Sequence, residues 1–170
     1  MFIAHLPAGY LMTRHFAIKR PHRRLLILTG LCASILPDLD LLWFYLIDGR
    51  QTAHHAYLFH APLFWIFMGI LAFIITRLTR CRKAEPFIWV ALLAILLHMV
   101  LDSVAAEIAW LKPFSAYEVN LVQVPARYGW WVWNFVLHWT FLLEIGIVAI
   151  AGMTLWCDLL RQPDNSRNER

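Results

Sequence analysis

The sequence has little of what marks a soluble or disulfide-bonded protein. Only 15% of its 170 residues are charged, and the three cysteines, Cys32, Cys81 and Cys157, are far apart and show no CxxC spacing. This usage indicates neither a disulfide framework nor a zinc site made of thiolates. The chain has no glycine-rich phosphate loop, internal repeat or low-complexity tract. Residues 1–12 lack a basic start and a small-residue cleavage site, so we expect no removable signal peptide.

Apolar side chains dominate the composition. Hydrophobic residues make up 61% of the chain, which includes nine Trp and eleven Phe, and the mean hydropathy is +0.58. These values lie outside the range of soluble domains and indicate several membrane spans. The net charge of +4 comes from basic residues in short loops, without a basic stripe of interleaved aromatics. We therefore expect the membrane bilayer as a partner and no nucleic acid.

The apolar runs predict an all-α fold, a polytopic membrane helix bundle. A span needs about 20 residues, so the run 2–13 predicts only a short N-terminal half-helix or re-entrant segment, interrupted near Pro7 and Gly9. Four transmembrane helices are expected after it. The first of them should break at Pro37, because the residue before a proline avoids the helical conformation. The four predicted spans cover residues 25–47, 62–76, 86–110 and 130–160.

The remaining segments are predicted to lie at the membrane surface. Residues 111–128 are expected to form an ordered loop at the interface, and the following Trp130, Trp131 and Trp133 are typical of an aromatic belt. We interpret residues 1–160 as one integral membrane domain that carries a metal site. The polar residues 161–170 predict a disordered cytoplasmic tail.

Lys and Arg are divided unequally between the two sets of loops. One side has only Arg50, Lys112 and Arg127, and the other has twelve basic residues. Cytoplasmic loops are enriched in Lys and Arg, so we predict that the richer side, with the C-terminus, faces the cytoplasm. The twelve residues are Arg14, Lys19, Arg20, Arg23, Arg24, Arg77, Arg80, Arg82, Lys83, Arg161, Arg167 and Arg170.

His98 and Asp102 stand inside a long apolar run. Four residues apart, they project from one face of a helix, ~40° from each other. In a soluble core this spacing would favour a structural hydrogen-bonded pair, and that alternative stays open. A charged group at the bilayer centre costs roughly 2.5–3.5 kcal/mol on insertion scales, whereas an interhelical hydrogen bond returns only about 0.6 kcal/mol. We therefore interpret the pair as functional.

Other histidines and acids are predicted at the same depth, in the outer half of the bilayer. Imidazoles with carboxylates suit zinc, manganese or ferrous iron, and not calcium. A tetrahedral site needs about four ligands, and the excess here indicates one or two ions, with zinc as first choice, or one ion with a general base. The candidate metal ligands are His5, Asp38, Asp40, His55, His60, His98, Asp102 and His138, and the candidate catalytic carboxylates are Asp40 and Glu144.

Several candidates also have a structural interpretation. Asp38 and Asp40 share a side if the chain at the kink is extended, but diverge by ~200° on a helix, where they could simply cap the kink. His54 or His55 could be a hydrated loop residue, and His54 is not among the predicted ligands. Glu144 could form an interhelical hydrogen bond with Asn134.

Five short motifs, in order and at similar spacing over residues 5–114, resemble a known family. It comprises the membrane-bound metal-dependent hydrolases, also described as LexA-binding, inner-membrane-associated hydrolases. The resemblance implies a bacterial inner-membrane location, hydrolase activity and metal ligands at the matching His and Asp positions. The His-x-x-x-Asp element is also similar to that of zinc-dependent phospholipase C, which points toward phosphoesters. The motifs are His5; Leu36-Pro37-Asp38-Leu39-Asp40; His55 and His60; His98 to Asp102; and Trp110-Leu111-Lys112-Pro113-Phe114.

One motif departs from the family pattern. Many members read His-Arg-Gly-x-Thr-His-Ser, whereas residues 55–61 here read His-Ala-Tyr-Leu-Phe-His-Ala. The absent Arg could have bound an anionic substrate through two parallel hydrogen bonds. Arg50, Lys112 or Arg127 could replace it.

These features together predict an enzyme that hydrolyses an ester or phosphoester of a membrane lipid or lipid-linked substrate with metal-activated water. A site in the outer half of the bilayer favours such a substrate over a freely soluble one. Two alternatives stay open: a transporter of metal ions or protons, because intramembrane His and acidic residues also mark ion pathways, and a non-catalytic adaptor with a structural metal. The chain has no inverted repeat, which argues against transport.

The predicted topology can be tested with reporter fusions. Fusions after residues 20, 82 and 165 should report the cytoplasm, and fusions after residues 55 and 120 should report the periplasm, because basic loops stay inside. Paired alkaline phosphatase and green fluorescent protein fusions give opposite signals on the two sides. A cytoplasmic signal at 55 and 120 would place the histidine loop on the wrong side and refute a shared outer site.

Overall fold

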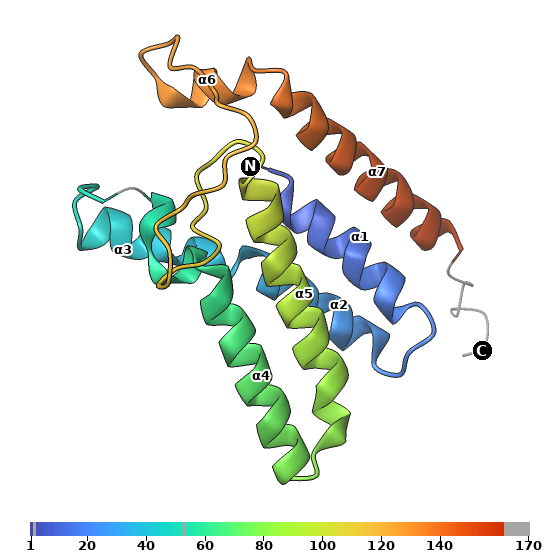
Figure 1. Ribbon diagram of the computed structural model, residues 1–170. Helices are drawn as coiled ribbons and strands as arrows, with labels where there is room; N and C mark the ends of the chain where they lie inside the picture. Colours follow the sequence, from blue (N-terminus) through green and yellow to red (C-terminus); the bar gives the residue numbers. More distant parts are fainter. Residues whose placement is uncertain (2, 53, 162–170) are drawn as a thin grey trace.

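The chain folds into a bundle of α-helices and short 3₁₀ turns, seen in a computed structural model that describes residues 1, 3–52 and 54–161 (Figure 1). Over these residues it has no β-strand, only an isolated bridge between Ile108 and Val119. Nearly all of the predicted tail, residues 162–170, lies outside the described part. The longer elements are α1 (His5–Ala17), α2 (Arg23–Ile35), α3 (Asp40–Leu46), α4 (Pro62–Leu78), α5 (Glu85–Asp102), α6 (Trp131–Val136) and α7 (Thr140–Leu160), and the 3₁₀ turns are η1 (Pro37–Leu39), η2 (His54–Ala56), η3 (Leu58–His60) and η4 (Arg82–Ala84).

Helix α1 is the predicted N-terminal half-helix, but it is not interrupted. It runs through Pro7 and Gly9 without a break. Pro7 is its third residue, where a backbone N–H would have no intrahelical partner, so the missing donor costs no helical hydrogen bond. At 13 residues the helix is about 20 Å long, too short to cross a bilayer alone.

The predicted break at Pro37 is confirmed. Helix α2 ends at Ile35, η1 begins at Pro37, and α3 continues at an angle of 48° to α2. The chain stays helical on both sides of the break. The alternative of an extended segment at this point is therefore wrong.

Within the described residues, two helices are long and apolar enough to cross a membrane, and the bent α2–α3 pair could be a third. The two are α7 and the unit of η4 with α5, residues 82–102. Helix α4 is apolar but has only 17 residues, and the expected single helix over residues 130–160 is divided into α6 and α7. Four transmembrane helices thus remain a prediction.

Helix α5 lies at the centre of the bundle and contacts α1, α2 and α4 (Figure 1). Its inner face contributes Ala94, Ile95 and Met99 to a buried apolar cluster that also contains Ala33 of α2 and Ile108. Asp102 is the last residue of α5, so the packing of this helix fixes the position of the Asp102 carboxylate.

Helices α1 and α2 approach each other at two glycines. A Cβ atom at Gly30 would lie 1.9 Å from Oγ1 and 2.8 Å from Cβ of Thr13, and one at Gly9 would lie 2.5 Å from Cβ of Ser34. Small residues allow such close backbone approach, as in many membrane helix pairs. The contact at Gly9 also fixes the backbone of Ser34, which faces the site described below.

Two acidic side chains of α7 bind it to the N-terminal segment: Glu144 near the start of α7 and Asp158 near its end. Glu144 accepts hydrogen bonds from the backbone N–H groups of Ile3 (2.6 Å) and Ala4 (3.2 Å). Asp158 binds the Arg14 guanidinium through two hydrogen bonds, of 2.7 and 2.6 Å. Figure 1 accordingly shows α7 beside α1, with α6 next to its start.

The close contact between α1 and α2 predicts a destabilised Gly30→Ala variant. The new methyl group would meet Thr13 Cβ, which is attached to the backbone, so the helices must separate. Overpacking of this kind costs about 1–3 kcal/mol, and we expect a lower melting temperature in detergent. Gly152→Ala in α7 is the matched control, because a Cβ there meets nothing within 4 Å. Equal melting temperatures of the two variants would contradict the packing.

Candidate metal centre

Four distant segments bring their His and acidic residues together at one end of the bundle. The start of α1 supplies His5, the turn η1 supplies Asp38, and the C-terminal turn of α5 supplies His98 and Asp102. The turns η2 and η3 supply the remaining histidines, His54, His55 and His60. Figure 1 shows the start of α1, the α2–α3 break and the end of α5 meeting at this end.

His98 is buried and held in one orientation. Its Nδ1 lies 2.8 Å from the carbonyl oxygen of Ser34. A carbonyl only accepts, so Nδ1 carries a proton, and in the neutral ring Nε2 presents a lone pair. That Nε2 atom has no hydrogen-bond partner and lies 3.0 Å from Oδ2 of Asp102.

His60 repeats this arrangement with a carboxylate. Its Nδ1 donates to Oδ2 of Asp40 over 2.7 Å, and both side chains are buried. Its Nε2 is also buried without a hydrogen-bond partner, 3.7 Å from Asp102 Oδ2 and 3.8 Å from Asp38 Oδ1. Metal-binding histidines usually donate their second N–H to a carboxylate or backbone carbonyl in this way.

The spacing of the donor atoms fits a small metal ion. Bonds of about 2.0–2.1 Å at tetrahedral angles put neighbouring ligand atoms roughly 3.3–3.4 Å apart. The Nε2 atoms of His60 and His98 lie 3.0–3.8 Å from Asp102 Oδ2 and Asp38 Oδ1. His60, His98 and Asp102 are all at most 2% exposed, and each offers a ligand atom within 4.8 Å of the others. These residues could therefore bind a metal ion.

Two further groups of possible ligands overlap with this one. His5 with Asp38 and His98 forms one group, and His54 with His55 and His60 forms the other. The His5 ring stacks on the His98 ring at 3.8 Å, and His5 Nε2 lies 3.1 Å from Asp102 Oδ1. The amino group of Met1 contacts the same oxygen.

The structure places Asp40 and His54 differently from the sequence-based prediction. Asp40, expected as a ligand or a base, lies behind His60 and is in none of the ligand groups of the described residues. His54, interpreted as a hydrated loop residue, lies 3.2 Å from Asp40 Oδ1 and 3.6 Å from Asp38 Oδ1. The only sequence signal for His54 was its position next to His55. In the turn η2 both neighbours reach the cluster.

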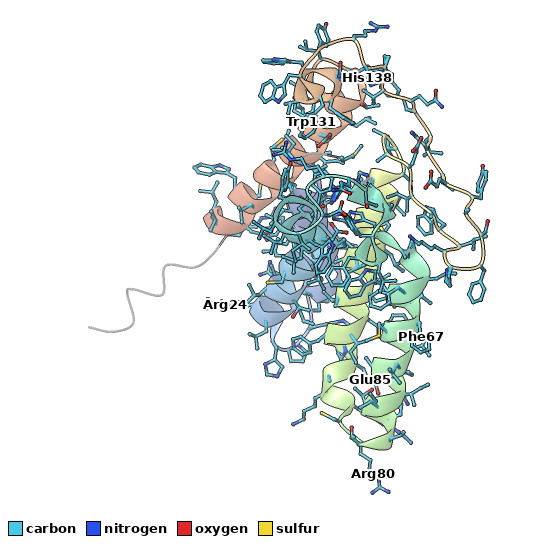
Figure 2. All side chains as sticks on the ribbon, turned by 90° about the vertical axis from the view of Figure 1, so that its left-hand side faces the viewer. Arg24, Phe67, Arg80, Glu85, Trp131 and His138 are labelled. Atoms are coloured by element: carbon cyan, nitrogen blue, oxygen red, sulfur yellow. The ribbon has the colours of Figure 1, made fainter. Side chains whose placement is uncertain are left out.

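Two other candidates are not brought into the ligand groups. His138 follows α6, and its Nδ1 lies 2.9 Å from the Thr140 hydroxyl. Figure 2 shows His138 at the far end of the molecule, beyond Trp131. Glu144 binds the backbone of Ile3 and Ala4, as described above. Its expected bond to Asn134 does not form, since Asn134 bonds the backbone at Tyr128.

The two loop histidines differ in their affinity for protons. Burial acts to lower the pKa of His54, but the hydrogen bonds and charges of Asp38 and Asp40 outweigh it and raise this pKa to about 9. Burial dominates at His55 and lowers its pKa to about 3. Neutral His55 can offer a lone pair, whereas His54 supplies positive charge beside the acids.

A hollow of about 210 Å³ opens onto the cluster. Asp38, His54, His55 and Asp102 form its polar side, and Trp131 of α6 is on its apolar side. Asp38 is the most exposed of the three acids, with 32% of its side chain accessible, against 6% for Asp40 and 2% for Asp102. A molecule entering the hollow would therefore meet Asp38 readily.

Neither Arg50 nor Lys112 lines this hollow. The Lys112 ammonium binds the carbonyl oxygen of Ala56 at 2.5 Å, and the Arg50 guanidinium lies over the Tyr45 ring. Arg127 is also absent from the lining. The structure thus gives no replacement for the arginine of the related histidine motif at this position.

Comparisons with known proteins agree with the membrane character of the chain. No curated protein and no solved structure matches it significantly. A family described as YdjM inner membrane protein matches residues 1–162, which include every residue of the cluster. The apolar helices and this nearly complete match identify the chain as a member of the YdjM inner membrane protein family.

Proposed function

We propose that the protein is a membrane-bound metal-dependent hydrolase that cleaves an ester or phosphoester of a membrane lipid or lipid-linked substrate. The observation that carries the proposal is the pair of buried imidazoles whose Nδ1 atoms are bound by Ser34 and Asp40. Their Nε2 atoms are left without hydrogen bonds beside two carboxylates. Leaving such buried polar atoms unpaired costs about 1–3 kcal/mol each, which a ligand ion would remove.

Three buried residues, His60, His98 and Asp102, would hold the ion. Two nitrogens and one oxygen at this spacing suit zinc, with manganese or iron as alternatives, and catalytic zinc sites usually have three protein ligands and one open position. When bound, the ion supplies a Lewis acid that activates water and polarises the ester oxygen. The surrounding residues of the chain would position the substrate and move the proton.

Asp38 is the proton acceptor in this proposal. Its Oδ1 lies 3.7–3.8 Å from the Nε2 atoms of His98 and His60, and its side chain borders the hollow. It could therefore accept a proton from a water molecule in the hollow beside these histidines. Asp40 is already engaged with His60, and Glu144 with the backbone near α1, so neither is as well placed for this role.

An apolar hollow of about 440 Å³ beside the cluster supports a lipid substrate. Leu42, Trp43 and Leu46 of α3 form one wall, and Leu58 and Phe59 of η3 form the other. The polar residue Asp40, which holds His60, also borders it. A hydrocarbon chain in this hollow would end next to the proposed metal ligands, whereas a small soluble ester would gain nothing from these walls.

Metal binding can be tested with a His98→Ala variant. The variant loses one of three ligands, so zinc content after dialysis should fall on the order of tenfold or more. Elemental analysis of the purified protein measures it. His15→Ala, an exposed histidine of α1, is the control and should keep the wild-type content. Full occupancy in His98→Ala would show that His98 and Asp102 are a structural pair.

The reaction can be tested in vesicles that contain the protein with zinc or manganese. We expect metal-dependent release of product from one member of a panel of long-chain phospholipids and lipid-linked phosphates, and none from the matching soluble headgroup esters. Asp38→Asn should abolish release while retaining the metal, because it removes the proton acceptor and leaves the three ligands. Ion flux is recorded in the same vesicles. Flux that depends on Asp38 and Asp102 without lipid turnover would instead show a transporter, and neither signal would favour an adaptor.

A further inference from the structure

Another hollow lies at the other end of the bundle, between the α1–α2 connection and the start of α5. It has a volume of about 290 Å³ and is separate from the proposed metal site. Figure 2 shows Arg80 and Glu85, which mark this end, opposite Trp131 and His138. Positive charge lines one part of the hollow and hydrocarbon the other. Its basic residues are Arg20, His22 and Lys83, and its apolar residues are Pro21, Leu26, Pro86 and Phe87.

The basic side chains of this hollow have no acidic partner among the described residues. Two acids at this end of the bundle are already paired: Glu85 binds Arg77 at 2.9 Å, and Asp158 binds Arg14 and Arg23. Arg20 forms no ion pair in the part of the chain that the structure describes, although its guanidinium stacks over the Phe16 ring at 4.1 Å. Lys83 forms none within the same residues. An anion from outside the protein would therefore find two cations available.

The apolar wall of the hollow is part of the protein core. Leu26 is 1% exposed and packs with Ala17 and Val90, and Phe87 packs against the same cluster. Phe87 belongs to the first turn of α5, where the predicted membrane span begins. The hollow thus joins the apolar surface of a span to the basic loops beside it.

We propose that this hollow binds an anionic phospholipid, with the phosphate between Arg20 and Lys83 and the start of an acyl chain along Leu26 and Phe87. Basic residues at the membrane surface attract anionic headgroups, and basic pockets between membrane helices bind them specifically. Free phosphate shares the charge but would gain nothing from the apolar wall, so the geometry favours the lipid. The proposal does not depend on the hydrolase activity, because none of these residues belongs to the metal site.

Native mass spectrometry of the detergent-purified protein with added phosphatidylglycerol tests this proposal. The wild-type protein should retain phosphatidylglycerol in preference to phosphatidylcholine, and excess soluble glycerol phosphate should not displace it. Equal retention of both lipids would overturn the proposal. Displacement by glycerol phosphate would show that the hollow binds soluble phosphate and not a lipid.

A pair of double variants separates a defined site from general surface charge. Arg20→Gln with Lys83→Gln should weaken retention on the order of tenfold. Lys19→Gln with Arg80→Gln removes the same charge from the same two connections, but neither residue lines the hollow, so retention should stay at the wild-type level. An equal loss in both double variants would contradict the proposed site.

Discussion

Two hydrogen bonds donated by histidine Nδ1 atoms orient the imidazoles on which the candidate metal centre depends. The Ser34 carbonyl and the Asp40 carboxylate can only accept, so each fixes a proton on Nδ1 and turns Nε2 into the cluster, where it has a lone pair when the ring is neutral. Without these two bonds the imidazole rings could rotate and form hydrogen bonds with other partners. With them, two buried lone pairs face the acids Asp38 and Asp102, an arrangement that a cation stabilises. The candidate metal centre is thus oriented by Ser34 and Asp40, which do not themselves belong to the proposed ligand group.

The rest of the bundle supports these two bonds. Gly9 and Gly30 allow α1 and α2 to approach closely, which places the Ser34 backbone against α5. The break at Pro37 turns Asp38 toward the centre while Asp40, two residues later, reaches His60. Because Asp38 and Asp40 diverge on a helical backbone, Asp38 lies near the His60 Nε2 atom, whereas Asp40 binds Nδ1 of the same ring. The opposite, basic end is built differently, with cations gathered around apolar side chains.

Much of the site could be predicted from the sequence, because its strongest signals are local. His98 and Asp102 lie one helical turn apart, and Pro37 marks the break that the structure contains. Predictions that depended on how distant segments pack together were less accurate. Residues 130–160 are mostly apolar, so the division between α6 and α7 left no clear signal, and the depth assigned to His138 assumed one continuous helix. The position of His54 depends on the conformation of the loop that contains η2, and the periodicity of a sequence does not predict a loop conformation.

The most direct test of this account is the zinc affinity of an Asp40→Ala variant, measured by competition with a chelator. Asp40 lies outside the proposed innermost ligand group, so the variant keeps all three ligands and loses only the bond that orients His60. Removing such a partner typically weakens metal binding 10–100-fold, and we expect a loss of about that size. Asp48→Ala, a partly exposed acid of the connection after α3 and outside the ligand groups, serves as control and should bind as the wild type does. Equal affinity of the two variants would contradict the claim that the bound imidazoles create the metal centre.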